Sequence, residues 1–212
     1  MKSTRYTFIV QRLATILAVS ILSLSWLAAI TGILLAFYYS PAAGGAFESM
    51  QQITTKIPSG WLIRSLHDIS GNGLIAVSLV QIVVMFLGRH CRPSWLIAWV
   101  GGILLTLVAI ALGWSAMALD WSQVGYWRFS LELETIKAIP WMGSQLRDIL
   151  TGGDGIATVT LQHLYALHSY VLSMAALMLS IIHLVGLLMQ ERNHQHLQAL
   201  QPETETNAIS PV

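Results

Sequence analysis

The stretch 164–190, LYALHSYVLSMAALMLSIIHLVGLLMQ, contains two histidines, His168 and His183, and no charged residue. A helix needs about 20 apolar residues to cross a bilayer, so this stretch predicts a membrane-spanning helix. Ionisable side chains are costly inside a membrane and usually serve a function there. The stretch therefore predicts both a spanning helix and a functional pair of histidines.

Three further stretches, about 13–39, 69–88 and 93–119, are long, apolar and free of charged residues. With 164–190 they predict an all-α fold, an integral membrane four-helix bundle surrounded by lipid. The whole chain of 212 residues agrees, because 55% of it is hydrophobic and only 10% is charged. The 11 basic residues nearly balance the 10 acidic ones, which argues against a nucleic-acid partner.

Basic residues predict the orientation of the bundle. Segment 1–12 carries three of them and the short link 89–92 carries two. By the positive-inside rule the N-terminus, this link and the C-terminus face the cytoplasm or its equivalent. The surface segment, about 120–161, then lies on the outer side, with short helices expected at about 124–139 and 144–150.

The chain is thus expected to have three parts. Residues 1–12 form a cytoplasmic-side N-terminus, residues 13–190 a multi-pass transmembrane domain, and residues 191–212 a polar tail without fixed structure. The single cysteine cannot form an intrachain disulfide, and the sequence has no C-x-x-C-H motif for attaching a c-type haem.

The spacing of the histidines predicts two stacked sites. His168 and His183 are 15 residues apart, which places them on one helix face, about 22 Å apart along the axis. His67 lies near the outer end of the second span, at the depth of His168, and Gln81 lies 14 residues further on, at the depth of His183. Inward imidazoles on opposed helices are a known way to hold haem iron. For a single histidine, a plain hydrogen bond to a neighbouring helix is an equally good interpretation.

Several strings resemble one known family. They are GWLIRSLH at 60–67, QVGYW at 123–127, AIP at 138–140 and LHSYVL at 167–172. Over residues 12–190 the chain resembles the N-terminal, haem-binding part of the cytochrome b family, and most of all its short, split form, cytochrome b6. The 15-residue spacing of the last two histidines is also that of the split form.

The resemblance implies a four-helix bundle that holds b haems and transfers electrons. His67 and His168 match the ligands of the outer haem, and His183 matches one ligand of the inner haem. Arg64 matches an arginine that neutralises a haem propionate. Gly32 and Gly102 match glycines that let haem approach the backbone.

The family also implies partners. Its members oxidise quinol on the outer side and reduce quinone on the inner side of a larger complex. We expect a subunit carrying the C-terminal half of cytochrome b, a Rieske-type iron–sulfur protein and a c-type cytochrome. The chain is then an electron-transfer subunit of a quinol oxidoreductase, and it is not catalytic alone.

The chain departs from the family pattern at several positions. Gln81 stands where the fourth histidine is expected, and an amide is a weak ligand for iron. The family carries paired glycines, 14 residues apart, on its first and third helices. Here the partner positions of Gly32 and Gly102 are Ala18 and Ala116. Asp120 replaces a proline, and Ile16 replaces the cysteine that attaches an extra haem, so no covalent haem is expected.

These departures leave the inner site open to three interpretations. His183 is hydrogen-bonded to Gln81 in an empty site, or His183 alone binds a five-coordinate haem, or Met85 supplies the second ligand. We favour the second, because Gly102 leaves room for haem.

Two other functions compete with the first. The chain is a structural or assembly subunit that kept the fold with a reduced redox role, or it is a four-helix b-haem anchor of another oxidoreductase. Intact His67, His168 and Arg64 oppose the former, and the family strings oppose the latter.

Overall fold

The computed structural model describes the backbone of residues 2–88 and 93–208, and the side chains of residues 8–88 and 96–192. Within these ranges every regular element is a helix. In chain order the elements are α1 (Lys2–Ala36), α2 (Ala46–Thr55), α3 (Gly60–Gly88), α4 (Pro93–Leu119), α5 (Gln123–Lys137), α6 (Gly143–Thr151), α7 (Thr158–Ala166), the π-helical turn η1 (Leu167–Leu172) and α8 (Ser173–Ala208).

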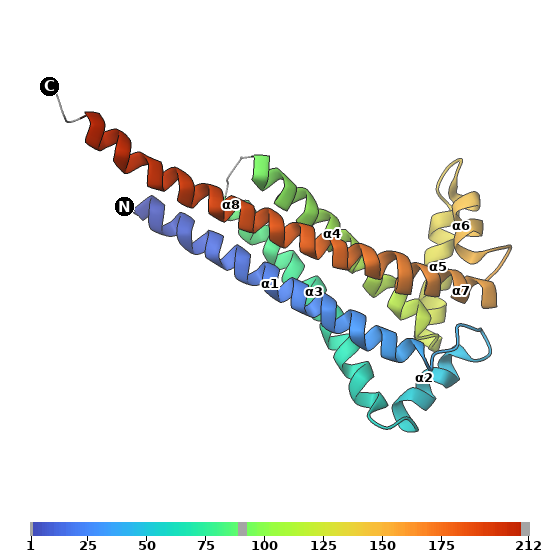
Figure 1. Ribbon diagram of the computed structural model, residues 1–212. Helices are drawn as coiled ribbons and strands as arrows, with labels where there is room; N and C mark the ends of the chain where they lie inside the picture. The colour runs from blue at the N-terminus through green and yellow to red at the C-terminus, as the bar shows by residue number, and fades with distance from the viewer. Residues whose placement is uncertain (1, 89–92, 209–212) are drawn as a thin grey trace.

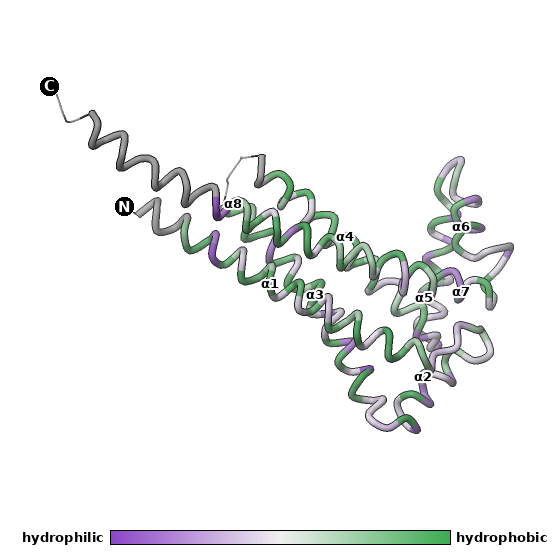
Figure 2. Tube along the Cα trace, in the orientation of Figure 1, coloured by the Kyte–Doolittle hydropathy of each residue, from purple (hydrophilic) through white to green (hydrophobic). Residues whose placement is uncertain are grey.

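Four long helices, α1, α3, α4 and the continuous α7–η1–α8, lie side by side as a bundle (Figure 1). Each contains a segment long and apolar enough to cross a membrane: Phe8–Ala36, Gly60–Gly88, Leu96–Leu119 and Thr158–Arg192. Figure 2 shows hydrophobic residues along most of each long helix and a more polar mixture in the short ones. The prediction of an all-α transmembrane bundle is confirmed.

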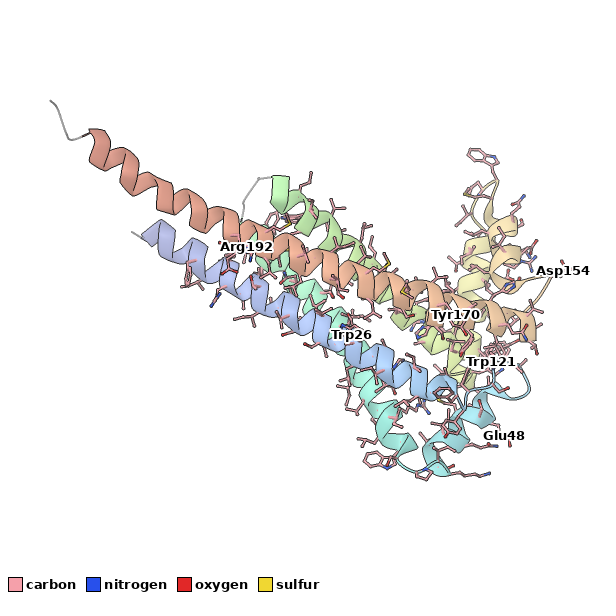
Figure 3. All side chains as sticks on the ribbon, in the orientation of Figure 1. Trp26, Glu48, Trp121, Asp154, Tyr170 and Arg192 are labelled. Atoms are coloured by element: carbon pink, nitrogen blue, oxygen red, sulfur yellow. The ribbon has the colours of Figure 1, made fainter. Side chains whose placement is uncertain are left out.

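The two ends of the bundle differ. At one end, called here the loop end, lie α2, α5 and α6 with their connections (Figure 1). At the other, called the terminal end, α1 begins and α8 leaves the bundle. Figure 3 shows Glu48, Trp121 and Asp154 at the loop end and Arg192 toward the terminal end.

Two helices begin earlier at the loop end than the hydrophobic pattern indicates. α3 begins at Gly60 rather than at residue 69, so Arg64 and His67 lie inside the helix. The last span begins at Thr158 rather than at residue 164. Charged or polar residues marked the expected boundaries, but a helix can carry them in its first turns, where they reach the membrane surface.

A tight turn between α2 and α3 depends on a glycine. A Cβ atom at Gly60 would lie 1.9 Å from the carbonyl oxygen of Ile53, so no larger residue fits. Ser59, directly before it, adopts φ 59. The turn reverses the chain and points the start of α3 back into the bundle.

The surface segment contains the two short helices that the sequence predicts, now placed at Gln123–Lys137 and Gly143–Thr151. Helix α2 was not predicted. The expectation that the tail has no fixed structure is wrong for part of it, because α8 continues to Ala208.

Buried apolar residues form three layers along the bundle. The terminal-end layer contains Val10, Ala14, Ala18, Val84, Met85, Ala98 and Leu187. The middle layer contains Ile21, Leu74, Leu105, Ala109 and Ala176. The loop-end layer contains Ala46, Ala118, Leu119, Phe129, Leu133, Leu161 and Leu164. The predicted histidine sites lie on either side of the middle layer.

Candidate functional site

His67 is held by helix α1. Its Nδ1 lies 3.0 Å from the carbonyl oxygen of Ala28 and 3.1 Å from Oγ1 of Thr31. The Thr31 hydroxyl itself donates to the carbonyl of Leu27, so Nδ1 of His67 carries the proton and donates to both oxygens. The other ring nitrogen, Nε2, is then the unprotonated one and is available as a metal ligand.

His168 lies in η1 and is held in the same way by α4. Its Nδ1 lies 2.9 Å from Oγ of Ser115. Ser115 is fully buried, and its hydroxyl donates to the carbonyl of Ala111. Nδ1 of His168 therefore donates to Ser115, and Nε2 again carries the lone pair.

The structure brings His67 and His168 together, as the spacing predicts. Their ring centroids are 6.3 Å apart, with an angle of 59° between the ring planes. Two imidazoles on one metal ion, with bonds of about 2 Å and ring centres about 1 Å behind the ligating nitrogens, have centres about 6 Å apart. The separation therefore fits a pair of axial ligands.

A missing side chain on α1 makes room beside this pair. A Cβ atom at Gly32 would lie 3.0 Å from Cε1 of His67, closer than side chains ordinarily pack. Glycine thus lets the imidazole lie directly against the α1 backbone. The donor set and this close approach both fit an iron atom held between two histidines.

His183 faces Gln81 near the terminal end, also as the spacing predicts. Nε2 of His183 is 2.9 Å from Nε2 of Gln81, and Nδ1 is 2.8 Å from the carbonyl oxygen of Ala98. The Gln81 amide also donates to the carbonyl of Ala14, at 3.1 Å. Nδ1 of His183 is therefore the donor to Ala98, and Nε2 accepts from Gln81. The ring is completely buried.

The donor set at His183 does not fit bis-histidine ligation. Gln81 takes the position opposite the ring, and its amide NH₂ group occupies the imidazole lone pair. A Cβ atom at Gly102 would lie 2.9 Å from Cε1 of His183 and 3.6 Å from the sulfur of Met85. The close approach of backbone to ring is thus repeated here, and Met85 lies nearby.

Arg64 lies one turn before His67 and bridges α3 to the end of α4. Its Nη2 donates to Oδ1 of Asp120 at 2.6 Å, and its Nε lies 3.9 Å from Asp68. Both partners of the close pair are about one-third exposed. The residue that replaces the family's proline therefore supplies the carboxylate on Arg64.

Tyr39 forms a hydrogen bond next to the Arg64–Asp120 ion pair. Its hydroxyl donates to the carbonyl of Leu119 at 2.7 Å. Burial, and then the nearby carboxylate of Asp120, raise the pKa of Tyr39 well above its ordinary value, so the phenol stays protonated. This bond joins the end of α1 to the end of α4 beside the ion pair.

The sequence did not identify the residues that orient the histidines and Arg64. Thr31, Ser115 and Asp120 lack a motif of their own, and the Ala28 and Ala98 partners act through backbone oxygens. The only sequence signal for Thr31 and Ser115 was that each is a polar residue inside an apolar span, at the same membrane depth as a histidine. Many serines and threonines in these spans only bond to their own helix, as Ser25 does, so that signal alone is weak.

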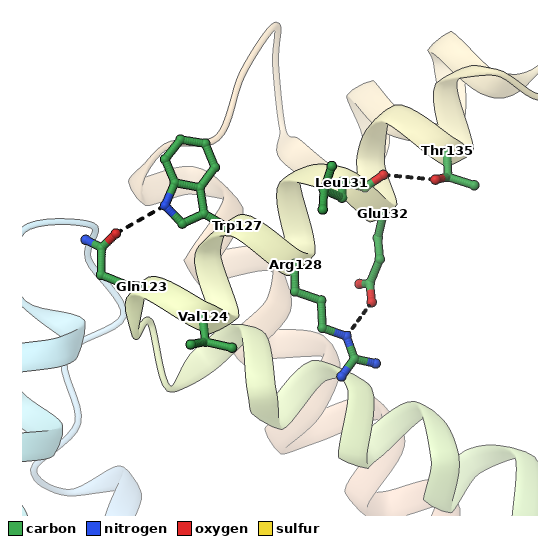
Figure 4. Close-up of a pocket in the computed structure, with 7 residues that line it drawn as sticks. All are labelled: Gln123, Val124, Trp127, Arg128, Leu131, Glu132 and Thr135. Carbon is green, nitrogen blue, oxygen red and sulfur yellow. Dashed lines mark hydrogen bonds and ion pairs between the residues drawn. The ribbon is translucent and has the colours of Figure 1, made fainter.

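A separate groove lies on α5, outside the bundle (Figure 4). It has a volume of about 500 Å³, and its walls come from Gln123, Val124, Trp127, Arg128, Leu131, Glu132 and Thr135. Arg128 forms an ion pair with Glu132 at 2.9 Å, and Glu132 also accepts from the indole of Trp114 on α4 at 2.6 Å. The groove contains none of the three bundle histidines.

Within the part of the chain that the structure describes, no three His, Cys, Asp or Glu side chains are grouped to hold a metal ion. The bundle instead contains one facing imidazole pair, His67 and His168, and the single imidazole of His183.

The comparisons with known proteins agree with this geometry. Residues 6–191 match the model of the family described as Cytochrome b/b6/petB. The chain is 35% identical over 154 residues to cytochrome b6 of Oltmannsiellopsis viridis, and 31% identical over 153 residues to that of Synechococcus elongatus. Each alignment covers 72% of this chain and 71% of the relative.

A solved structure is also similar. A chain of a hyperthermophilic respiratory Complex III superposes with a TM-score of 0.69 and 26% sequence identity, over 83% of this chain. The match covers 47% of that chain, so this protein spans about half of its length. On the family match, the sequence relatives and the shared fold, the chain belongs to the cytochrome b/b6 family.

Proposed function

We propose that the chain is a haem b-binding electron-transfer subunit of a cytochrome bc- or b6f-type quinol oxidoreductase. The observation that carries this proposal is the facing pair His67 and His168, with ring centroids 6.3 Å apart. Family membership supports the same conclusion.

One b haem is held between these two histidines at the loop end. When bound, it accepts and releases one electron at a time. The chain's own residues fix the site around it. Thr31 and Ser115 fix the tautomer that leaves each Nε2 free. Gly32 has no side chain, so the His67 ring can lie against the α1 backbone.

Arg64 supplies positive charge next to this site. A guanidinium has five N–H donors, so it can bind a haem propionate while it keeps its bond to Asp120. In this chain the charge of Arg64 is shared with a carboxylate. We therefore assign Arg64 to the propionate and Asp120 to positioning Arg64.

The site near the terminal end lacks ordinary bis-histidine ligation. His183 is its single imidazole, and Gln81 faces it at 2.9 Å. Gly102 leaves room beside the ring, which supports a haem bound by His183 on one side only. The hydrogen bond to Gln81 supports the alternative, a site without haem in which the two polar groups satisfy each other.

The orientation and partners follow from the family and from charge. The terminal end faces the cytoplasm or its equivalent, because α1 begins there within the basic segment 1–12, and α3 ends at Gly88, directly before two further basic residues in the sequence. The match covers 47% of the similar Complex III chain. A second subunit that carries the remaining half of cytochrome b is the partner we propose, with a Rieske-type protein and a c-type cytochrome beyond it.

The α5 groove lies at the end where such a partner completes a quinol site. Val124, Trp127 and Leu131 are between 61% and 76% exposed, which is unusual outside the membrane-spanning part of a protein. We assign this face to the partner subunit.

Haem stoichiometry with spin state tests the proposal. Wild-type protein is expected to show one low-spin b haem in a reduced-minus-oxidised spectrum, and His67→Ala or His168→Ala to abolish it. Gln81→His is expected to add a second low-spin haem. Two low-spin haems in the wild type would refute the altered site.

A structural or assembly role is the second candidate, favoured by the His183–Gln81 hydrogen bond. It predicts no haem signal at all in purified membranes, so the same spectrum separates the two functions.

A further inference from the structure

Three glutamines form a polar column in the half of the bundle nearest the terminal end. Gln81 and Gln190 are each 1% exposed, and Gln11 is half-buried. Among the described membrane-spanning residues, the buried side-chain atoms without a hydrogen-bond partner all belong to these three amides: Nε2 of Gln11, Oε1 of Gln81, and both Nε2 and Oε1 of Gln190.

The three amides are stacked toward His183. Arg12 and Glu191, which follow Gln11 and Gln190 directly, form an ion pair at 3.1 Å. This contact sets Gln11 and Gln190 at one level, at the rim of the bundle. Gln190 lies seven residues beyond His183 on α8, which is the same helix face about 10 Å nearer the rim.

Gln81 closes the column at its deep end. Its amide nitrogen is fully used by His183 and by the carbonyl of Ala14, one turn from Gln11 on α1. Its oxygen has no partner. Beyond it lies the middle layer, whose Ile21 and Leu105 are completely buried. The polar column therefore stops at Gln81 and does not reach the loop-end histidines.

Unpartnered amides are costly inside a membrane, and lipid cannot satisfy them. One such group is tolerable, but three such amides, two at the rim level and one deeper, require a small molecule that both donates and accepts hydrogen bonds. Water does both and typically makes about three bonds in a buried site. The rim above the column is a charged pair in contact with solvent.

We propose that Gln11, Gln190 and Gln81 line a water-filled half-channel that opens at the terminal end and ends at His183. The channel gives water, and the protons it carries, access to His183 from one side of the membrane. The middle layer seals the channel from the other side, so the bundle does not leak.

Cysteine accessibility tests the channel in membrane vesicles that contain the full chain. The single native cysteine, Cys91, is first replaced by serine. The probe is 2-aminoethyl methanethiosulfonate, which reacts with thiolates, and thiols ionise only where water reaches them. Gln190→Cys is compared with Leu187→Cys, which is matched to it because Leu187 is also on α8 and also 1% exposed, but lies in the apolar terminal-end layer.

We expect Gln190→Cys to react at least tenfold faster than Leu187→Cys. Equal, slow rates at both positions would overturn the proposal, because the glutamine would then be as dry as the leucine. Complete labelling of both after denaturation in SDS shows that each thiol is intact, and gel filtration verifies that each variant is folded.

A second pair tests the deep end and does not depend on Gln190→Cys folding. Gln81→Cys should react faster than Met85→Cys, which is one turn away on α3 and also 1% exposed. Adding Gln190→Leu should slow Gln81→Cys several-fold by blocking the column. An unchanged rate would show that the two glutamines do not share one path. Both readouts are labelling rates and neither is a haem spectrum, so the proposed electron-transfer function is tested separately by its own spectrum.

Discussion

Each bundle histidine has its Nδ1 proton committed to a neighbouring helix. The partners are Ala28 and Thr31 for His67, Ser115 for His168, and Ala98 for His183. Such bonds fix both the tautomer and the ring angle of a ligand before any metal binds. The orienting groups should therefore affect haem retention although they do not touch the iron.

Ser115→Ala tests the contribution of these orienting hydrogen bonds. The substitution removes the hydroxyl that accepts from Nδ1 of His168, so haem affinity should fall about tenfold. Haem retained after detergent dialysis is the measurement. Ser25→Ala is the control, because Ser25 is also buried but bonds only to its own helix, and equal haem loss in both variants would contradict the assignment.

Gly32→Ala should be more severe, and it acts on the ring of His67. The added Cβ atom would lie 3.0 Å from Cε1 of His67, so the ring must move away from its ligand position. We expect most of the low-spin absorbance to disappear while the protein stays in the membrane. Gly71→Ala is the matched control, since a Cβ atom there meets nothing within 4 Å. A Gly32→Ala variant with the wild-type spectrum would show that the close approach is not needed.

At the scale of elements, the π-helical turn explains why the two site positions are spaced differently on α3 and on the last span. His67 and Gln81 are 14 residues apart on α3, whereas His168 and His183 are 15 apart. η1 spans Leu167–Leu172 and contains His168. A π-turn inserts one extra residue into an α-helix, so both pairs span the same length of regular helix, and each histidine meets its partner on α3.

Removing one residue from η1 should therefore be tolerated. Deleting Val171, which is 59% exposed, converts the π-turn to an α-turn and leaves the helix on both sides in register. The low-spin spectrum should persist. Deleting Leu79, which is 48% exposed on α3, has no extra turn to remove and rotates the helix by about 100°, so haem binding should be lost. Similar spectra from the two deletions would contradict this explanation.

The sequence predicts elements well where membrane burial governs them and poorly elsewhere. The four spans follow from long charge-free runs, because lipid excludes charge. Helix α2, with sequence AFESMQQITT, has no such run and is stabilised by tertiary contacts around Ala46 and Ile53. The sequence pattern does not indicate the π-turn either, because its residues are as apolar as those of the α-helix around it.

The candidate site was likewise predictable from the sequence only in part. Facing histidines follow from helix period and depth, and so does the pairing of His183 with Gln81. Their hydrogen-bond partners do not, because Thr31 and Ser115 are defined by how neighbouring helices rotate. The Arg64–Asp120 ion pair joins residues 56 positions apart, and nothing in the local pattern of either residue indicates it.

At the scale of the whole molecule, the two proposed metal-ligand levels of the bundle are structurally separate. Along α8 they are about 22 Å apart, and the middle layer of Ile21, Leu74, Leu105, Ala109 and Ala176 lies between them. Changes at well-separated positions without shared partners usually act independently. Haem incorporation at one level should therefore not depend on the other.

The combination of His168→Ala with Gln81→His tests this independence. His168→Ala removes the loop-end ligand pair, and Gln81→His creates two imidazoles at the level of His183, on the helices that now carry the 2.9 Å contact. The double variant should contain one low-spin haem, the one gained by Gln81→His in the otherwise wild-type chain. Redox titration should give that haem a single midpoint potential. The combination Gln81→His with His183→Ala is the control and should gain none. If Gln81→His gains haem in the wild-type background but not beside His168→Ala, the two levels form cooperatively, and the middle layer does not isolate them.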